Sequence, residues 1–174
     1  YYKTFMWPKK FWYSLYEPAI RKSAGLGKSP TQPDPELYEH KYIHCDVLVV
    51  GGGISGIIAA SISADNGNST LLINDKNSLG GSTIYQYDQN YKINEQISSD
   101  WLNYEINNLK NKKNLTILNR TSLAAYHSYN FLLARENISD HKSLHERSNQ
   151  LRQRLWKIRA KKVILATGAI ERPL

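Results

Sequence analysis

The chain has 174 residues, of which 41% are hydrophobic, and it carries a formal net charge of +8 at pH 7. This length is enough to bury one ordinary hydrophobic core. The single cysteine, Cys45, excludes an internal disulfide bond and is typical of a reducing compartment, so we expect a cytoplasmic protein. No apolar run approaches the roughly 20 residues that span a membrane, and the basic residues are scattered. We therefore predict neither a membrane protein nor a nucleic-acid-binding protein.

Residues 1–45 are predicted to form an aromatic-rich lead-in and a linker. Aromatic side chains are dense in residues 1–16, which usually marks a segment that packs against another domain. Residues 11–24 favour a helix that Pro18 interrupts or restarts. Residues 25–35 read GLGKSPTQPDP, and their glycines and prolines predict a loop. The chain starts without methionine and stops just after a strand-like run, so we expect it to be part of a longer protein.

The most informative stretch is DVLVVGGGISG at residues 46–56. Its apolar run leads into glycines and then into an isoleucine-rich pattern, which predicts a buried parallel strand that turns sharply into a helix. Gly51 permits the tight turn, Gly53 lets a pyrophosphate approach the backbone, and Gly56 lets the helix pack close to the strand. N–H groups at the start of the helix carry partial positive charge and can hold phosphates. The motif predicts adenine-dinucleotide binding by Gly51, Gly52, Gly53, Ile54, Ser55 and Gly56.

A second predicted strand follows the helix and ends where an acidic residue usually binds the ribose hydroxyls. Asn74 occupies that position, and an acidic residue, Asp75, comes one step later. We predict that Asp75 makes the ribose contact, with Lys76 beside it. The next loop contains the small residues Gly81 and Ser82, whose backbone can also approach the cofactor.

One helix and an antiparallel insertion are predicted next. Apolar residues recur at helical spacing over residues 93–109, with Asn94 as a cap, and a third strand follows at residues 115–118. Three short segments within about residues 121–160 have strand propensity, which predicts an antiparallel β-meander.

The last strand-like run, residues 163–165, leads into Ala166-Thr167-Gly168. A tight turn of small residues there lets backbone approach a nucleotide, so Thr167 and Gly168 complete the predicted site. The predicted fold class is α/β: a Rossmann-like FAD/NAD(P)-binding fold over residues 46–174. It has a parallel sheet with the inserted antiparallel meander, and it is incomplete at the C-terminus.

The glycine motif after the first strand and the ATG turn after a meander together resemble flavoproteins with two dinucleotide-binding domains. The flanking segments sharpen this resemblance. YYKTFMWPKKFWYSLYEPAIRKSAGLG, NRTSLAAY and LWKIRAKKVILATGAIERPL are similar to the alpha subunits of heterotetrameric sarcosine oxidases, and the resemblance covers essentially the whole chain.

This resemblance implies the nucleotide-binding part of an enzyme that demethylates sarcosine oxidatively to glycine, with hydrogen peroxide and a one-carbon unit passed to tetrahydrofolate. It implies NAD in this domain, with FAD as the alternative. FAD and FMN would lie elsewhere in an assembly with beta, gamma and delta subunits. We find no catalytic acid, base or nucleophile and predict no metal site. Two functions stay open besides: an FAD-dependent oxidoreductase or dehydrogenase acting on another small-molecule amine or imino acid, and a non-catalytic subunit-docking module.

Overall fold

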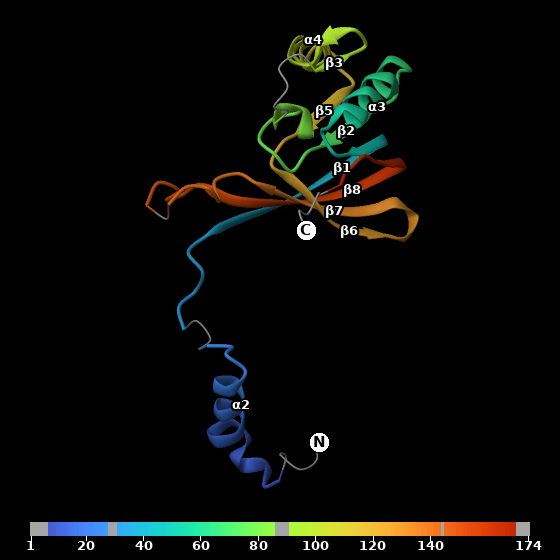
Figure 1. Cartoon of the computed structure of the whole chain (residues 1–174). Helices are drawn as coiled ribbons and strands as arrows, with labels where there is room; N and C mark the ends of the chain where they lie inside the picture. Colours follow the sequence, from blue (N-terminus) through green and yellow to red (C-terminus); the bar gives the residue numbers. More distant parts are fainter. Residues whose placement is uncertain (1–6, 28–30, 86–90, 144, 170–174) are drawn as a thin grey trace. The chain divides into compact units, whose positions relative to one another are not determined.

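The computed structural model describes residues 7–27, 31–85, 91–143 and 145–169. The chain divides into two compact units, Tyr1–Pro35 and Glu36–Leu174 (Figure 1). This division lies earlier in the chain than the boundary after residue 45 that the sequence predicted. Part of the aromatic lead-in, residues 1–6, lies outside the described residues, and so does the end of the resemblance, residues 170–174.

The first unit contains three short helical segments: η1 (Lys9–Phe11), η2 (Trp12–Tyr16) and α2 (Glu17–Ser23). Pro18 lies in the first turn of α2, where its missing N–H leaves no helical hydrogen bond unmade, so the proline restarts the helix. The helix ends before Gly25, whose φ of 67° reverses the chain. Trp7 and Tyr13 are 79% and 85% exposed. Their packing against another domain stays a prediction.

The second unit is built on one six-stranded sheet with the strand order β5-β2-β1-β8-β7-β6. β5, β2, β1 and β8 are parallel to one another, and β8, β7 and β6 pair antiparallel. The predicted α/β class, with a parallel sheet and an antiparallel meander, is confirmed. The strands are β1 (Leu37–Val50), β2 (Thr70–Ile73), β5 (Leu115–Leu118), β6 (Thr121–His127), β7 (Phe131–Asn137) and β8 (Leu151–Leu165).

β1 and β8 are much longer than the sequence predicted. They run side by side from the pair Leu37–Leu151 to the pair Val50–Leu165 (Figure 1). The last strand of the predicted meander, which was to end at about residue 160, and the predicted strand at residues 163–165 are therefore one strand, β8. β7 pairs with β8 only as far as Arg159, so residues 162–165 have no strand on that side within the described part of the chain.

Helices α3 (Ile54–Asp65) and α4 (Ser98–Lys110) cover one face of the parallel strands (Figure 1). Under them lies a cluster built from Val47, Val49, Ile57, Ala60, Leu72, Leu79, Trp101 and Leu109. The other face carries a cluster of strand residues that includes Leu48, Val50, Leu71, Ile73, Leu132 and Ile158. Both faces of β2 and of residues 47–50 of β1 are thus buried, as the continuous apolar runs predict, and each large buried side chain contributes roughly 1.5–3 kcal/mol.

The predicted start of the second helix was wrong. Lys92–Ile93 (β3) and Gln96–Ile97 (β4) form a hairpin, and α4 begins only at Ser98. Asn94, the predicted cap, and Glu95 form the turn with φ values of 48° and 64°. A two-residue hairpin turn of this kind needs positive φ at both positions, and Asn adopts it more readily than most residues. None of the helices in the described part of the chain has the length and apolar character that a membrane span requires.

Candidate functional site

A cavity of ≈ 640 Å³ lies at the carboxyl ends of β1, β2 and β8. It is lined by eleven of the twelve predicted contact residues: Gly51, Gly52, Gly53, Ile54, Ser55, Asp75, Lys76, Gly81, Ser82, Thr167 and Gly168. Gly56 is the predicted residue that does not line it. Six further residues line the cavity: Asn74, Tyr85, Ile164, Leu165, Ala169 and also Ala166, which belongs to the turn predicted at residues 166–168. The structure therefore brings four separate predicted segments, residues 51–55, 75–76, 81–82 and 167–168, together around one space.

Gly51 and Gly56 hold the corner where β1 turns into α3. Gly51 has a φ of 111°, and its N–H donates to the carbonyl oxygen of Ile73 at 2.8 Å. A Cβ at Gly51 would overlap the carbonyl oxygen of Ala166, and a Cβ at Gly56 would overlap that of Gly51. Side chains at these two positions would push the strand, the helix and the final turn apart, so Gly56 serves the packing of this corner.

Gly53 is different, because the space around it is open. It is the N-cap of α3 with a φ of −75°, and no atom lies within 4 Å of the place where its Cβ would be. Glycine cannot cap the helix with a side chain, so the first N–H groups of α3 stay available to a ligand. A Cβ at Gly81 would lie 3.0 Å from the Cα of Gly53, so the two glycines form a narrow wall of backbone. These features fit the phosphate groups of a dinucleotide.

Asn74 is a site residue that the sequence reasoning passed over. Its side chain is buried, with 3% exposure, yet it lines the cavity. Asp75, the predicted ribose ligand, has a side chain that is 58% exposed and forms an ion pair of 3.3 Å with Lys76. Both residues lie at the cavity, so the ribose contact of Asp75 stays a prediction. The signal for Asn74 was present, since it occupies the usual acidic position at the end of the second strand.

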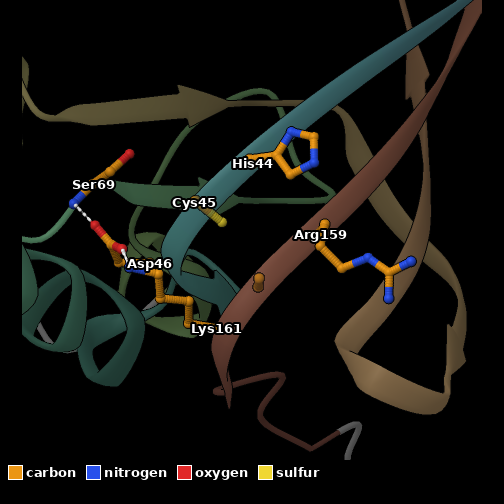
Figure 2. A pocket seen from close by; sticks show the side chains of 7 residues that line it. His44, Cys45, Asp46, Ser69, Arg159 and Lys161 are labelled. Atoms are coloured by element: carbon orange, nitrogen blue, oxygen red, sulfur yellow. Dashed lines mark hydrogen bonds and ion pairs between the residues drawn. The ribbon is translucent and has the colours of Figure 1, made fainter.

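A second cavity, of ≈ 360 Å³, lies near the amino end of β2 (Figure 2). Asp46 accepts a hydrogen bond of 2.8 Å from the backbone N–H of Ser69 and forms an ion pair of 2.7 Å with Lys161. The hydrogen bond from Lys161, followed by that from Ser69, holds the pKa of Asp46 below its usual value. The cavity is lined by His44, Cys45, Asp46, Ser69, Arg159, Ala160 and Lys161.

Cys45 lacks the lowered thiol pKa that is typical of a nucleophilic cysteine. Burial, together with the nearby charge of Asp46, raises the pKa of its thiol to about 11, so the sulfur stays protonated at neutral pH. Within the described residues, no three His, Cys, Asp or Glu side chains gather in a way that could hold a metal ion. The first cavity is therefore the stronger candidate for function.

Comparison with known proteins shows what the chain is similar to. Residues 46–122 match the family described as FAD dependent oxidoreductase. The whole chain is 38% identical to the sarcosine oxidase subunit alpha of Rhizobium meliloti (strain 1021), and 86% of it is 33% identical to that of Corynebacterium sp. (strain P-1). The resemblance predicted from the sequence is confirmed: the chain is a relative of sarcosine oxidase alpha subunits, within the superfamily of flavoproteins with two dinucleotide-binding domains.

The chain spans only 17% and 15% of the lengths of these two relatives. Among solved structures, L-proline dehydrogenase from P. horikoshii matches 84% of this chain and 27% of its own, with a TM-score of 0.59 and 24% identity. A thioredoxin reductase from Lactococcus lactis matches 75% of this chain and 37% of its own, with a TM-score of 0.51 and 19% identity. These two likenesses concern the fold alone.

Proposed function

We propose that this chain binds the adenosine diphosphate half of a dinucleotide, as part of a flavin-dependent oxidoreductase that acts on amines. The observation that carries the proposal is the open space at Gly53, at the uncapped start of α3 and against Gly81. Backbone N–H groups there would hold the pyrophosphate, and Asp75 or Asn74 would face the ribose. The predicted contacts of Thr167 and Gly168 would close the site from the last turn.

The matched family supports a flavin, so FAD is the first candidate for the bound dinucleotide. NAD, which the sequence resemblance implied, is the second. Both molecules share the half that the cavity would hold. A bound flavin would supply the chemistry of accepting two electrons and a proton, equivalent to the hydride on the substrate carbon next to the amine nitrogen. The residues of this chain would bind and orient the cofactor.

The activity of the whole protein is proposed from its relatives. Sarcosine is the first candidate substrate, because the relatives that match the chain over most of its length are named sarcosine oxidase subunit alpha. Oxidative demethylation to glycine, transfer of the one-carbon unit to tetrahydrofolate, and assembly with beta, gamma and delta subunits rest on this resemblance. Another amine or imino acid is the alternative substrate. We also propose a cytoplasmic location, because the chain has a single cysteine.

The test is the dinucleotide content of the whole natural protein and of its Gly53→Val variant. Acid extraction and chromatography identify the dinucleotide of the wild-type protein as FAD or NAD. Valine fits the φ of Gly53 and its Cβ has no protein atom within 4 Å, but its side chain fills the space proposed for pyrophosphate. We expect at least about tenfold weaker binding, which corresponds to roughly 1.4 kcal/mol.

Gly53→Ser is the matched control. Serine is a good N-cap and valine a poor one, so the serine variant separates a capping effect from filled space. We expect the serine variant to bind more tightly than the valine variant, and both to keep a cooperative thermal transition. Wild-type dinucleotide content in Gly53→Val would overturn the assignment.

A further inference from the structure

We propose that Asn74 is a positioning residue that holds the ribose-facing wall of the dinucleotide site, and that its partners require a neutral amide at this place. This inference rests on the proposed function. It gives a physical reason why the chain lacks the acidic residue that usually ends the second strand in this motif.

The side-chain nitrogen of Asn74 shares its two N–H groups among three oxygen atoms. Nδ2 lies 2.8 Å from the carbonyl oxygen of Ser78, 3.2 Å from that of Lys76 and 3.2 Å from Oδ1 of Asn119. The first two partners are carbonyl oxygens, which only accept hydrogen bonds, so the nitrogen must face them. The carbonyl oxygen of Lys76 also accepts from the N–H of Arg120 at 2.8 Å. Asn74 therefore ties the loop after β2 to the turn between β5 and β6.

The same side chain also presses on the glycine motif. A Cβ at Gly52 would lie 2.7 Å from Cγ and 2.8 Å from Oδ1 of Asn74, so the amide packs directly on the backbone of Gly52. The loop after β2 also contacts this glycine directly, because the N–H of Gly80 donates to the carbonyl oxygen of Gly52 at 2.7 Å. The loop after β2 is thus fixed both to Asn74 and to the glycine motif. Residues of the loop, Asn74 and the glycine motif all line the cavity.

A carboxylate at this position would replace the hydrogen bonds to these oxygen atoms with electrostatic repulsion. Aspartate has the shape of asparagine but, when ionised, only accepts hydrogen bonds, and it would face three oxygen atoms in a buried place. When protonated, it can donate one hydrogen bond again. The loop and the wall of the cavity should therefore depend on pH in an Asn74→Asp variant, and not in the wild-type protein.

The experiment measures the dissociation constant of the extracted dinucleotide for the whole natural protein at pH 5.5, 7 and 8.5. We expect Asn74→Asp to bind at least about tenfold more weakly than wild type at pH 8.5, and to approach wild type within about threefold at pH 5.5. Asn74→Ala removes the donor without adding charge. We expect it to bind about three- to tenfold more weakly at all three pH values, and it serves if the aspartate variant does not fold.

Asn114→Asp is the matched control, because the same exchange is made away from the cavity. Nδ2 of Asn114 donates to the carbonyl oxygens of Ala64 at 2.7 Å and Asn68 at 2.9 Å. We expect this variant to lose thermal stability as the pH rises while its dissociation constant stays that of wild type. Wild-type affinity of Asn74→Asp at pH 8.5, an equal loss at every pH, or wild-type affinity of Asn74→Ala would overturn the inference. A wild-type protein without dinucleotide would instead overturn the proposed function.

Discussion

The two ends of the parallel strands are built from different groups. At the carboxyl ends, glycine backbone surrounds a cavity of ≈ 640 Å³, and the space beside Gly53 is open. At the amino ends of β2 and β5, side chains close the gap between strands and helix. There Asn114 donates to the carbonyl oxygens of Ala64 and Asn68, and the hydroxyl groups of Ser63 and Thr70 are hydrogen-bonded at 2.8 Å.

The two ends use similar hydrogen bonds from asparagine side chains, but they differ in whether these side chains border a cavity. Asn74 and Asn114 each use a side-chain nitrogen to hold carbonyl oxygens of a neighbouring loop or helix. Only Asn74 borders an open cavity. Asn114 lines neither of the two cavities described above, so we infer that its clamp serves stability alone, whereas the clamp of Asn74 at the carboxyl edge also shapes a binding site. The following changes would break or sharpen this comparison.

The largest effect is expected from Gly56→Ala. Its Cβ would overlap the carbonyl oxygen of Gly51, which is part of the corner between β1 and α3. Overpacking of this kind costs about 1–3 kcal/mol or more, although alanine favours a helix by roughly 1 kcal/mol over glycine. Urea denaturation of the variant measures the loss. Gly53→Ala, where the Cβ has open space, is the control and should change the free energy of unfolding far less. Equal stability of the two variants would show that the corner can relax.

A smaller effect is expected from Asn114→Ala at the amino edge. The variant removes the side-chain donor from the carbonyl oxygens of Ala64, where the bond is partly buried, and Asn68, where it is exposed. Water can replace part of this donor, so we expect a loss of about 0.5–1.5 kcal/mol. The dinucleotide content of each folded molecule should not change. Thermal unfolding and cofactor extraction on the same preparation check both statements. A lower content in the folded protein would mean that the two edges are coupled.

The parts of the site that could be predicted from sequence depend on local backbone requirements. Gly51 must adopt a positive φ directly after a buried strand, and Gly53 and Gly56 follow at fixed spacing. Such demands are written in consecutive residues, so the strand, the turn and the helix were predicted together. The buried faces of β1 and β2 follow from the continuous apolar run in the same way.

The parts that could not be predicted depend on residues far apart in the chain. Asn74 looked like a missing acid because one of its partners, Asn119, lies 45 residues later and the other two are backbone oxygens. The first half of β1 reads as a polar segment, and only its pairing with β8 makes it a strand. Ile93 and Ile97 fit the period of the helix but belong to a hairpin, because the turn residues between them set the local structure.

The smallest effect is expected from Asp46→Asn, which removes one charge at the amino edge (Figure 2). Asparagine can still accept the hydrogen bond from the N–H of Ser69, so the change isolates the ion pair with Lys161. Lys161 is 80% exposed, and water screens such a pair strongly, so we expect the melting temperature to fall by no more than about 1–2 °C at pH 7.

The pKa of Asp46 is lowered in the folded protein, mainly by Lys161, so its contribution is present above about pH 4 and is lost as the pH falls through the folded pKa. The pKa of Lys161 is raised, mainly by Asp46, so its contribution is lost as the pH rises above about 10.5. The pKa values of Glu39, Asp140 and Glu146 are also lowered, but these groups are common to both proteins. Melting curves of the two proteins should therefore differ between about pH 5 and 10 and converge at acid pH. A difference that persists unchanged at pH 2–3 would show that the substitution does not act through the charge of Asp46.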